Sequence, residues 1–374
     1  MLLLVVVFGV SGSRQTATDL FSPLEQLYQY IERYFYWPER IEDRALLYGA
    51  MKGLVKQLDD PYSEFLDPGD HERWEESLEG EFSGIGIEIT IKEGVLTVIA
   101  PLMETPAEQA GVRAGDQILA IDGESTEGIS LTEAALRIRG EVGTTVVLLV
   151  RHKDGTEEAI SITRAKIAVK TVTAELVANE RIGYIRLSRF DSDVTLDLDR
   201  ALLGLDLETL DGMILDLRNN GGGYAHEAVR VASRFVDSGV IYSKKGEISG
   251  EQKYWSTGNR VPNLPLVVLI NSGTASAAEI VAGAIRDHEM GILIGEHSFG
   301  KGVMQTKWVF SDGSALLLTT DEYLTPLGHA VHEIGLAPDI ELAEDEDPIE
   351  AAIAWIDAYI GERMPISLGD KDHG

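Results

Sequence analysis

The sequence contains no cysteine among its 374 residues. Disulfides, thiolate metal sites and cysteine nucleophiles are therefore excluded together. Basic residues are also scarce, because 32 Lys and Arg stand against 62 Asp and Glu and give a net charge of −30. The acidic excess is spread along the whole chain and repels phosphate backbones, so we expect no nucleic-acid partner. The chemistry must come from Ser, Thr, Lys, His or carboxylate groups.

The apolar start of the chain is short. Met1–Val10 reads MLLLVVVFGV, which is too short to span a bilayer and fits the core of a secretory signal peptide. No Lys or Arg precedes Arg14, so an ordinary apolar N-terminus is the alternative. We expect residues 1–18 to be a signal or anchor segment of an exported protein, located in the periplasm or another extracytoplasmic compartment. Membrane association through this segment stays open.

Residues 19–79 have the periodicity of amphipathic helices. A second helix is predicted from Ala45 to Leu58, because Asp59-Asp60-Pro61-Tyr62 breaks the pattern. We interpret the apolar and aromatic spacing of the first helix as core packing rather than a ligand site. This helical region is our candidate for contacts in a homo-oligomer, although no sequence feature fixes the oligomeric state. The apolar positions at helical spacing are Leu24, Leu27, Tyr28, Ile31, Tyr34 and Phe35.

The pattern changes to strand-like alternation at Gly80. Strands are predicted over Ser83–Ile91 and Val95–Ala100, and a short helix over Pro106–Gly111. A helix over Leu131–Arg139 and a strand over Thr144–Arg151 complete the predicted unit. This order resembles a PDZ domain of the kind found in bacterial proteases, over about residues 80–165.

The segment Gly84-Ile85-Gly86-Ile87 matches the peptide-binding loop of PDZ domains. Glycines allow consecutive backbone N–H groups to converge on a terminal carboxylate, while the adjoining strand accepts an extended peptide at its edge. A tight turn at the start of the strand is the structural alternative. With the PDZ-like segments behind it, we predict that Gly84, Ile85, Gly86 and Ile87 bind a peptide C-terminus.

Residues 166–341 alternate apolar strands with helices, which predicts an α/β core with a largely parallel sheet. Strands are expected over 181–187, 212–217, 264–270 and 291–295, helices over 224–236 and 275–286, and a hairpin over 301–320. Residues 342–374 form an acidic segment with a short helix, in which Asp347 is the N-cap and Pro348 the first helical residue.

Three segments of this core place glycine or polar residues where strands end: Asp216–Gly223, Asn271–Glu279 and Ser298–Gln305. Strand ends are where α/β proteins carry their sites. The glycine run suits a developing anion, and a phosphate loop is its weaker interpretation because the nucleotide-binding spacings are missing. A serine at the start of a helix can be a mere N-cap. A lysine between glycines can be a mere surface residue.

Together these segments resemble the carboxy-terminal processing proteases, also called tail-specific proteases. This serine peptidase family inserts a PDZ module before its catalytic core. The likeness extends over roughly residues 20–340, and the Ser276-to-Lys301 and Lys301-to-Gln305 intervals fit the family pattern. One departure is Gly221, where many members have proline.

The resemblance implies a catalytic set with Ser276 as the nucleophile, Lys301 as the general base and Gln305 orienting the lysine. It also implies an oxyanion hole formed by the backbone N–H groups of Gly222 and Ala277, without any cofactor or metal. Two such donors stabilise a tetrahedral intermediate. A lysine can take the serine proton only if burial lowers its pKa, so Lys301 must be desolvated and shielded from the negative field of the chain.

The orienting role of Gln305 has a geometric condition. Residues four apart in a straight strand lie ~13 Å apart. Gln305 therefore reaches Lys301 only if the chain bends at Gly302 or the lysine leans along the strand.

Other interpretations are weaker. A trypsin-like PDZ protease needs a Ser-His-Asp set and a Gly-Asn-Ser-Gly-Gly segment, which the chain lacks. His329 and His332 have the wrong spacing for a His-Glu-x-x-His zinc site. A hydratase-type fold has no use for a PDZ insertion. A non-catalytic PDZ scaffold on a degraded protease core is the main alternative, and the intact Ser276, Lys301 and Gln305 argue against it.

We therefore predict an α/β multidomain serine endopeptidase that cleaves proteins near apolar C-termini. Its partners are protein or peptide substrates with apolar C-termini, which the PDZ domain binds and either delivers or gates. The expected organisation is a signal or anchor segment (1–18), a helical region (19–79), a PDZ domain (80–165), an α/β peptidase core (166–341) and an acidic C-terminal segment (342–374).

Overall fold

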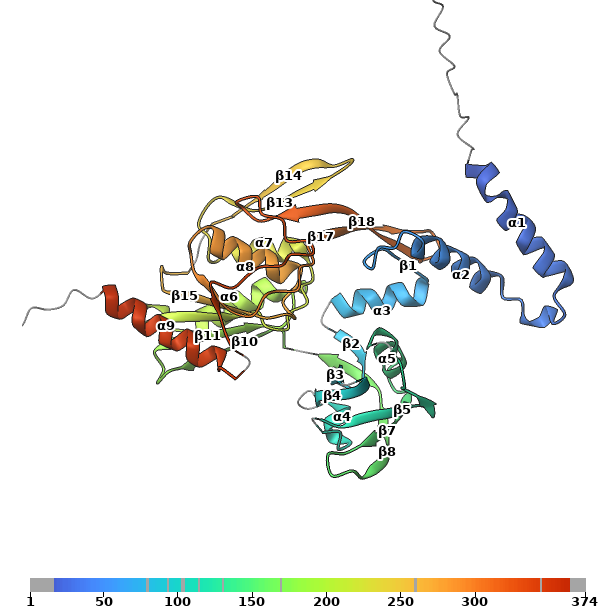
Figure 1. The fold of residues 1–374 in the computed structure, drawn as a ribbon, viewed down its shortest axis with the longest axis horizontal. Coiled ribbons are helices and arrows are strands. Elements are labelled where there is room, and N and C mark those ends of the chain that lie inside the picture. Colours follow the sequence, from blue (N-terminus) through green and yellow to red (C-terminus); the bar gives the residue numbers. More distant parts are fainter. Residues whose placement is uncertain are drawn as a thin grey trace, which may run out of the picture. The chain divides into compact units, whose positions relative to one another are not determined.

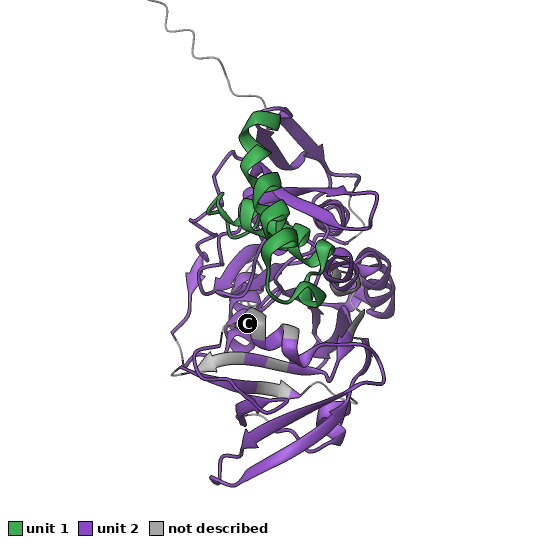
Figure 2. Cartoon of the chain, turned by 90° about the vertical axis from the view of Figure 1, so that its right-hand side faces the viewer, with its two compact units in different colours: residues 1–65 green, residues 66–374 purple. Residues whose placement is uncertain are grey.

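The computed structural model describes residues 17–78, 81–92, 94–101, 105–113, 115–129, 131–168, 170–258, 261–343 and 345–363. The chain divides into two compact units, residues 1–65 and residues 66–374 (Figure 2). The apolar segment Met1–Val10 lies outside the described residues. Within those ranges, no helix combines the length and the apolar character needed to cross a membrane.

The first unit contains two helices, α1 (Ala17–Tyr34) and α2 (Asp43–Lys56), with a 3₁₀ turn η1 (Pro38–Arg40) between them. The predicted helices are therefore present. The prediction that the apolar stripe of the first helix is core is wrong, because the side chains of Leu27 and Tyr34 are 53% and 68% exposed. Leu24 and Phe35 are exposed as well. Before residue 64, the first unit contains only these two helices and the turn among its described elements, so no further element there covers the apolar side chains of α1. The amphipathic periodicity therefore correctly indicated an apolar helix face, but that face is not buried.

The strand β1 (Glu64–Leu66) lies at the junction of the two units, and the second unit continues with α3 (Pro68–Leu78). Trp74 of α3 packs against the buried side chains of Leu66, Ala315 and Leu317. The imidazole Nδ1 of His71 lies 3.0 Å from the carbonyl oxygen of Gly313. The predicted helical region 19–79 thus spans the boundary between the two units, and α3 lies in the second.

The PDZ-like module is a five-stranded antiparallel path β3-β4-β5-β7-β8, with β6 paired to β5 and a separate two-stranded sheet of β2 and β9. The sequence pattern predicted no strand after Thr144–Arg151, whereas the structure adds β8 within the predicted range 80–165 and β9 at its end. Ile85, Leu96, Ile118 and Leu148 lie in its buried core. The elements are β2 (Glu81–Gly84), β3 (Ile87–Lys92), β4 (Val95–Pro101), α4 (Pro106–Gln109), β5 (Gln117–Ile121), β6 (Glu124–Ser125), α5 (Leu131–Ile138), β7 (Thr145–Arg151), β8 (Glu157–Thr163) and β9 (Ala165–Ala168).

The core of the second unit is a six-stranded sheet in the order β10-β11-β12-β15-β16-β19. All neighbouring pairs are parallel except β10 and β11. Side chains alternate between two buried clusters, so the central strands are covered on both faces. The strands are β10 (Val172–Val177), β11 (Ile182–Leu187), β12 (Gly212–Asp216), β15 (Leu266–Ile270), β16 (Ile292–Gly295) and β19 (Ile340–Glu341).

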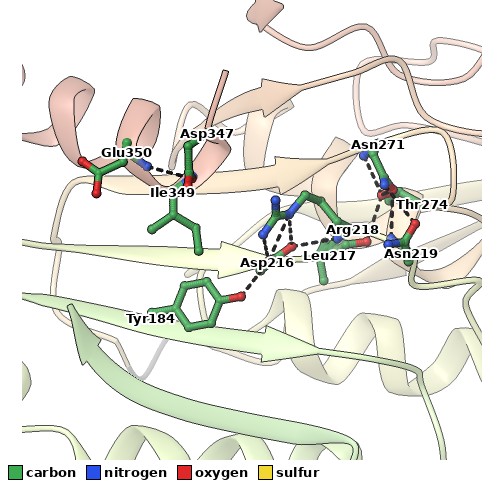
Figure 3. A network of polar contacts seen from close by, with 10 residues as sticks. All are labelled: Tyr184, Asp216, Leu217, Arg218, Asn219, Asn271, Thr274, Asp347, Ile349 and Glu350. Carbon is green, nitrogen blue, oxygen red and sulfur yellow. Dashed lines mark hydrogen bonds and ion pairs between the residues drawn. The ribbon is translucent and has the colours of Figure 1, made fainter. Parts of the chain in front are cut away.

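Helices cover both faces of this sheet (Figure 1). One face packs against α6 (Val194–Gly204), α7 (Ala225–Ala232) and α8 (Ala277–Asp287). The other packs against α9 (Pro348–Arg363) through Ala352 and Ile356. The predicted cap is confirmed, because the Asp347 carboxylate accepts hydrogen bonds from the N–H groups of Ile349 and Glu350 at 2.8 and 3.3 Å (Figure 3).

A second, antiparallel sheet in this unit joins two hairpins, β13 (Val240–Gly246) with β14 (Gly250–Trp255), and β17 (Val303–Val309) with β18 (Ala315–Leu324). The second hairpin is the predicted one. Parallel pairing is thus confined to one sheet, and the described sheets are mostly antiparallel. The expected parallel pairing is therefore limited to the six-stranded sheet, and the core also contains this antiparallel sheet, because strands joined by tight turns pair antiparallel. Sequence inspection also missed β10, α6, the 3₁₀ turn η2 (Leu207–Thr209) and the first hairpin.

Candidate active site

The three predicted site segments follow the carboxyl ends of β12, β15 and β16, which are neighbours in the sheet. Hydrogen bonds connect them directly. Thr274 Oγ1 donates to the carbonyl of Leu217, and the Ala275 N–H donates to the carbonyl of Asn220, both at 2.9 Å. The Phe299 N–H donates to the carbonyl of Thr274 at 2.9 Å. The structure therefore brings all three segments into one site.

Two side-chain networks fix the first loop (Figure 3). Asn219 and Asn271 exchange hydrogen bonds, because each side-chain oxygen accepts from an N–H of the other residue, at 2.8 and 2.9 Å. The fully buried Asp216 accepts from the Tyr184 hydroxyl at 2.7 Å and from the Arg218 guanidinium at 2.6 Å. Burial, together with this carboxylate, raises the pKa of Tyr184 to about 12, so the phenol stays a donor.

Ser276 stands at the N-cap of α8 with φ 55° and ψ −116°. A residue with a side chain reaches this backbone conformation only at a cost, and such strain concentrates at sites where a side chain must be presented at a sharp turn. A strained turn between a strand and a helix is how α/β hydrolases present their nucleophilic serine. Gly222 lies directly against this turn, since a Cβ on it would stand 2.8 Å from the Ser276 Cβ.

The Glu279 carboxylate connects the serine turn with the lysine turn. Its Oε2 accepts from the backbone N–H groups of Ser276 at 2.8 Å and Lys301 at 3.0 Å. These two nitrogens therefore lie within about 6 Å of one another. Its Oε1 accepts from the Ser298 hydroxyl at 2.5 Å and the Gly300 N–H at 2.7 Å. Burial raises the pKa of this carboxyl, and the four donors act against that shift.

The lysine turn is packed closely against a later segment of the chain. A Cβ on Gly302 would lie 2.1 Å from the backbone nitrogen of His332, so only glycine fits there. Lys301 is half-buried and precedes β17, whose register shifts between Met304 and Gln305. The stretch from Lys301 to Gln305 is thus not a straight strand, although this register shift lies beyond Gly302, where the bend was expected. The Gln305 amide donates to the Thr319 hydroxyl at 3.1 Å.

The two backbone N–H groups predicted to form the oxyanion hole, those of Gly222 and Ala277, differ in their hydrogen-bond acceptors. The Gly222 N–H donates to the Asn220 side-chain oxygen at 2.9 Å. The Ala277 N–H, at the start of α8, has no acceptor among the described residues and carries the positive end of the helix dipole. Gly222 must therefore exchange its Asn220 bond for a substrate oxygen if it is to act as the second donor.

The side chain of Tyr323, on β18, contacts the backbone of Ser276. Its hydroxyl donates to the Ser276 carbonyl at 3.2 Å, and its side chain is 1% exposed. Burial, with the neighbouring Glu279, raises the pKa of Tyr323 well above its usual range. The phenol therefore remains protonated and holds the serine turn in place.

Sequence reasoning did not assign roles to Glu279, Asn220 or Tyr323. Glu279 had a detectable signal, because Ser276 and Glu279 have the Ser-x-x-Glu spacing of a capping box. Asn220 lies in the predicted site segment Asp216–Gly223, but no feature of the sequence indicated that its side chain accepts a hydrogen bond from the same loop. Tyr323 carries no local signal, since it reaches the site from 47 residues away.

The predicted peptide-binding loop joins β2 to β3 in the PDZ-like module. Gly86 has φ 77°, and a Cβ on it would lie 2.4 Å from the Thr105 Cβ. The carbonyl of Ile85 accepts from the Ala107 N–H at 2.9 Å, and that of Gly86 from the Thr105 hydroxyl at 3.0 Å. Within the described part of the chain no acceptor takes the N–H groups of Ile85 or Gly86. One edge of β3 pairs with β4, and its other edge has no partner among the described strands.

Comparison with known families gives three matching models. The model for peptidase family S41 matches residues 181–342, and that for the PDZ domain matches residues 98–152. A third, described as the activating protease CtpB N-terminal domain, matches residues 9–69. The matches follow the order of the helical, PDZ-like and α/β parts of the chain.

Similar proteins extend this likeness over the whole chain. The carboxyl-terminal-processing protease of Picosynechococcus sp. is 36% identical over 100% of this chain and 94% of that protein. The carboxy-terminal processing protease CtpA of Bacillus subtilis is 35% identical over 92% of this chain and 73% of that protein. Among solved structures, a photosystem II D1 C-terminal processing protease matches with a TM-score of 0.62 and 33% identity, covering 87% of each chain.

Proposed function

This chain belongs to the carboxyl-terminal processing proteases of peptidase family S41, which are serine-type peptidases, and from that premise we propose that Ser276 and Lys301 form its catalytic dyad. The observation that carries the proposal is the shared carboxylate of Glu279, which holds the backbones of both residues at one oxygen. The strained Ser276 turn supports it.

The proposed reaction is acyl transfer. The neutral Lys301 amine takes the proton of the Ser276 hydroxyl as the oxygen attacks the scissile carbonyl. The N–H groups of Ala277 and Gly222 stabilise the oxyanion. Lys301 then gives its proton to the leaving amine, and an acyl-enzyme on Ser276 remains. A water molecule, deprotonated by Lys301, hydrolyses this ester and restores the serine.

Glu279 acts as a positioning residue in this scheme, since its two oxygens accept hydrogen bonds from three backbone N–H groups and from the Ser298 hydroxyl. An ionised carboxylate beside Lys301 would favour the protonated, inactive amine. Burial raises the pKa of Glu279 and so weakens this effect. Gln305 orients the Lys301 amine in the proposal.

The PDZ domain supplies recognition of the substrate C-terminus. We propose that the loop Gly84–Ile87 binds the terminal carboxylate and that the free edge of β3 pairs with the extended chain. The substrates are proteins or peptides with apolar C-termini, and the PDZ domain delivers them to Ser276 or gates access to it. Delivery or gating of a substrate explains why a PDZ domain accompanies a peptidase core. A non-catalytic scaffold would not explain the strained backbone conformation of Ser276.

The remaining proposals concern the setting of the enzyme. The apolar segment Met1–Val10 supports export to the periplasm or another extracytoplasmic compartment, and membrane association through it. The exposed apolar face of α1 supports a homo-oligomer.

The test is cleavage of an unfolded protein with an apolar C-terminus. We expect Ser276→Ala and Lys301→Ala each to lower kcat by at least roughly 10³-fold, because the dyad acts as a unit. Ser272→Ala, in the same turn, and Lys245→Ala, on the exposed side of β13, are matched controls and should cleave like the wild type. Wild-type rates in both dyad variants would refute the mechanism.

A second test addresses the PDZ loop. Amidation of the substrate C-terminus removes the carboxylate, so we expect weaker binding to the wild-type chain. Equal affinity for the acid and the amide would refute carboxylate capture while leaving the dyad untouched.

A further inference from the structure

A groove of about 900 Å³ lies at the edge of the parallel sheet where β12, β15 and β16 begin. Asp211 precedes β12, Leu266 opens β15 and Ile292 opens β16, and all three residues line the groove. The catalytic segments follow the opposite, carboxyl ends of the same strands. The five-residue strand β15 alone separates the two edges by about 16 Å. The groove is therefore distinct from the catalytic site.

An aromatic pair from α9 forms one wall of this groove. Trp355 and Tyr359 stand one helical turn apart, their ring centroids are 5.0 Å apart, and their planes are tilted by 23°. Both rings are half-buried, so part of each is accessible. The helix is held to the sheet by Ala352 and Ile356 on its buried side, which leaves these rings fixed on a stable element. Stacked aromatic rings of this kind attract cations and the planar guanidinium group.

The charged side chains of the groove are mostly acidic. Glu289 is exposed, with φ 56°, and its carboxylate makes no ion pair or hydrogen bond within the described part of the chain. The Asp339 carboxylate accepts only the Leu293 N–H among the described residues, at 2.8 Å. Arg286 also lines the groove, but its guanidinium lies 3.3 Å from the Asp287 carboxylate. Its positive charge is thus compensated, and the groove keeps a net negative charge.

We propose that this groove binds an extended peptide segment of a partner protein that carries an arginine or lysine side chain. The cationic group lies against the Trp355 and Tyr359 rings, and Glu289 and Asp339 supply the opposite charge. The flanking residues of the peptide contact the apolar side chains of Leu264 and Met290, which also line the groove. The volume is within the range of pockets that enclose a few residues of a ligand. The site works without Ser276 or the PDZ loop, so it does not depend on the proposed function.

The test uses a fluorescent peptide, acetyl-Gly-Leu-Arg-Leu-Gly-amide, and the full chain carrying Ser276→Ala. Both peptide ends are blocked, so the PDZ loop has no carboxylate to bind, and mass spectrometry checks that the peptide stays intact. Replacing arginine by citrulline keeps the shape and removes the charge. We expect at least a roughly tenfold weaker Kd for the citrulline peptide, and weaker binding of the arginine peptide as salt rises.

Two variants locate the site. Trp355→Ala should weaken binding roughly 3- to 10-fold, with Trp308→Ala on the exposed part of β17 as its control. Glu289→Lys should weaken it by a similar factor, and Glu350→Lys is its control because it makes the same charge reversal on α9 outside the groove. Glu289 lies beyond the end of α8, so this variant tests the groove even if Trp355→Ala perturbs α9.

Several outcomes would overturn the proposal. One is equal affinity for the arginine and citrulline peptides. Another is an equal effect of the Glu289 and Glu350 reversals, which would indicate nonspecific attraction to an acidic protein. A third is displacement of the peptide by an equal concentration of spermidine, which would indicate a polyamine site and not a peptide site. Each result is independent of proteolytic activity.

Discussion

The proposed catalytic turn at Ser276 and the proposed peptide-binding loop of the PDZ domain both present backbone N–H groups at tight turns, but they are held in different ways. The catalytic turn is assembled from three separated segments by buried side chains, with Glu279 bonded to four donors. The PDZ loop is held within its own module, by Thr105 and Ala107 on the segment around α4. Damage to the first should therefore lower kcat, and damage to the second should raise KM.

Among the variants that test this comparison, the largest effect is expected for Glu279→Gln. The amide places a new N–H group against donors, so two or more buried hydrogen bonds are lost. We expect kcat to fall by at least roughly 10²-fold and the unfolding free energy to fall by about 3 kcal/mol. Steady-state kinetics and urea unfolding measure both, and the exposed Glu296→Gln is the control. An unchanged kcat would show that the carboxylate does not position the dyad.

Gly222→Ala tests the close approach at the serine turn. The new Cβ would stand 2.8 Å from the Ser276 Cβ and 2.9 Å from the Ala275 carbonyl oxygen, at φ 99°. We expect a loss in kcat of roughly 10²-fold, comparable to removal of one oxyanion donor. The neighbouring Gly221→Ala meets no atom within 4 Å and should be nearly neutral. Similar rates for the two variants would remove Gly222 from the proposed site.

Gly86→Ala is the corresponding test of the PDZ loop. Its Cβ would lie 2.4 to 2.7 Å from Thr105 side-chain atoms, at φ 77°. We expect KM for a substrate with a free apolar C-terminus to rise by roughly tenfold, with little change in kcat for a short peptide blocked at its C-terminus. Gly94→Ala has a similar φ of 80° but open space around it, so it controls for backbone strain alone. Equal effects of both variants would contradict the role of the loop.

The smallest effect concerns the pH dependence of the PDZ domain. His152 Nδ1 lies 2.9 Å from the buried Asp116 carboxylate, and this hydrogen bond raises the pKa of His152 above its usual 6.5. Its stabilisation is complete below the unfolded-state pKa and is lost as pH rises through the folded-state pKa. Hydrogen exchange at β5 and β7, corrected for intrinsic rates, should show less protection at pH 8.5 than at pH 5.5.

The matched variant His152→Gln should remove this difference between the two pH values. If the pH dependence persists in that variant, the pair of His152 and Asp116 is not its source.

Much of the fold could be predicted because it depends on local patterns. The correctly predicted elements all have signals within a few residues of one another in the sequence. They are four strands of the parallel sheet, the helices α7 and α8, the hairpin of β17 and β18, and the Asp347 cap. The missed elements have weaker signals. The strand β10 is mostly exposed, and β13 with β14 carries charged residues that mask its alternation.

The sequence by itself determined the set of chemical groups and the segments that carry them. The absence of cysteine, the glycine run, the Ser-x-x-Glu spacing and the Gly-Lys-Gly turn are all local. Their arrangement was decided only by tertiary structure, because β12, β15 and β16 bring residues from distant segments to one edge. The same packing placed Tyr323 behind Ser276, committed the Gly222 N–H to Asn220 and left the apolar face of α1 exposed. Those outcomes depend on which side chains meet across the fold, and no period or motif along the chain records that.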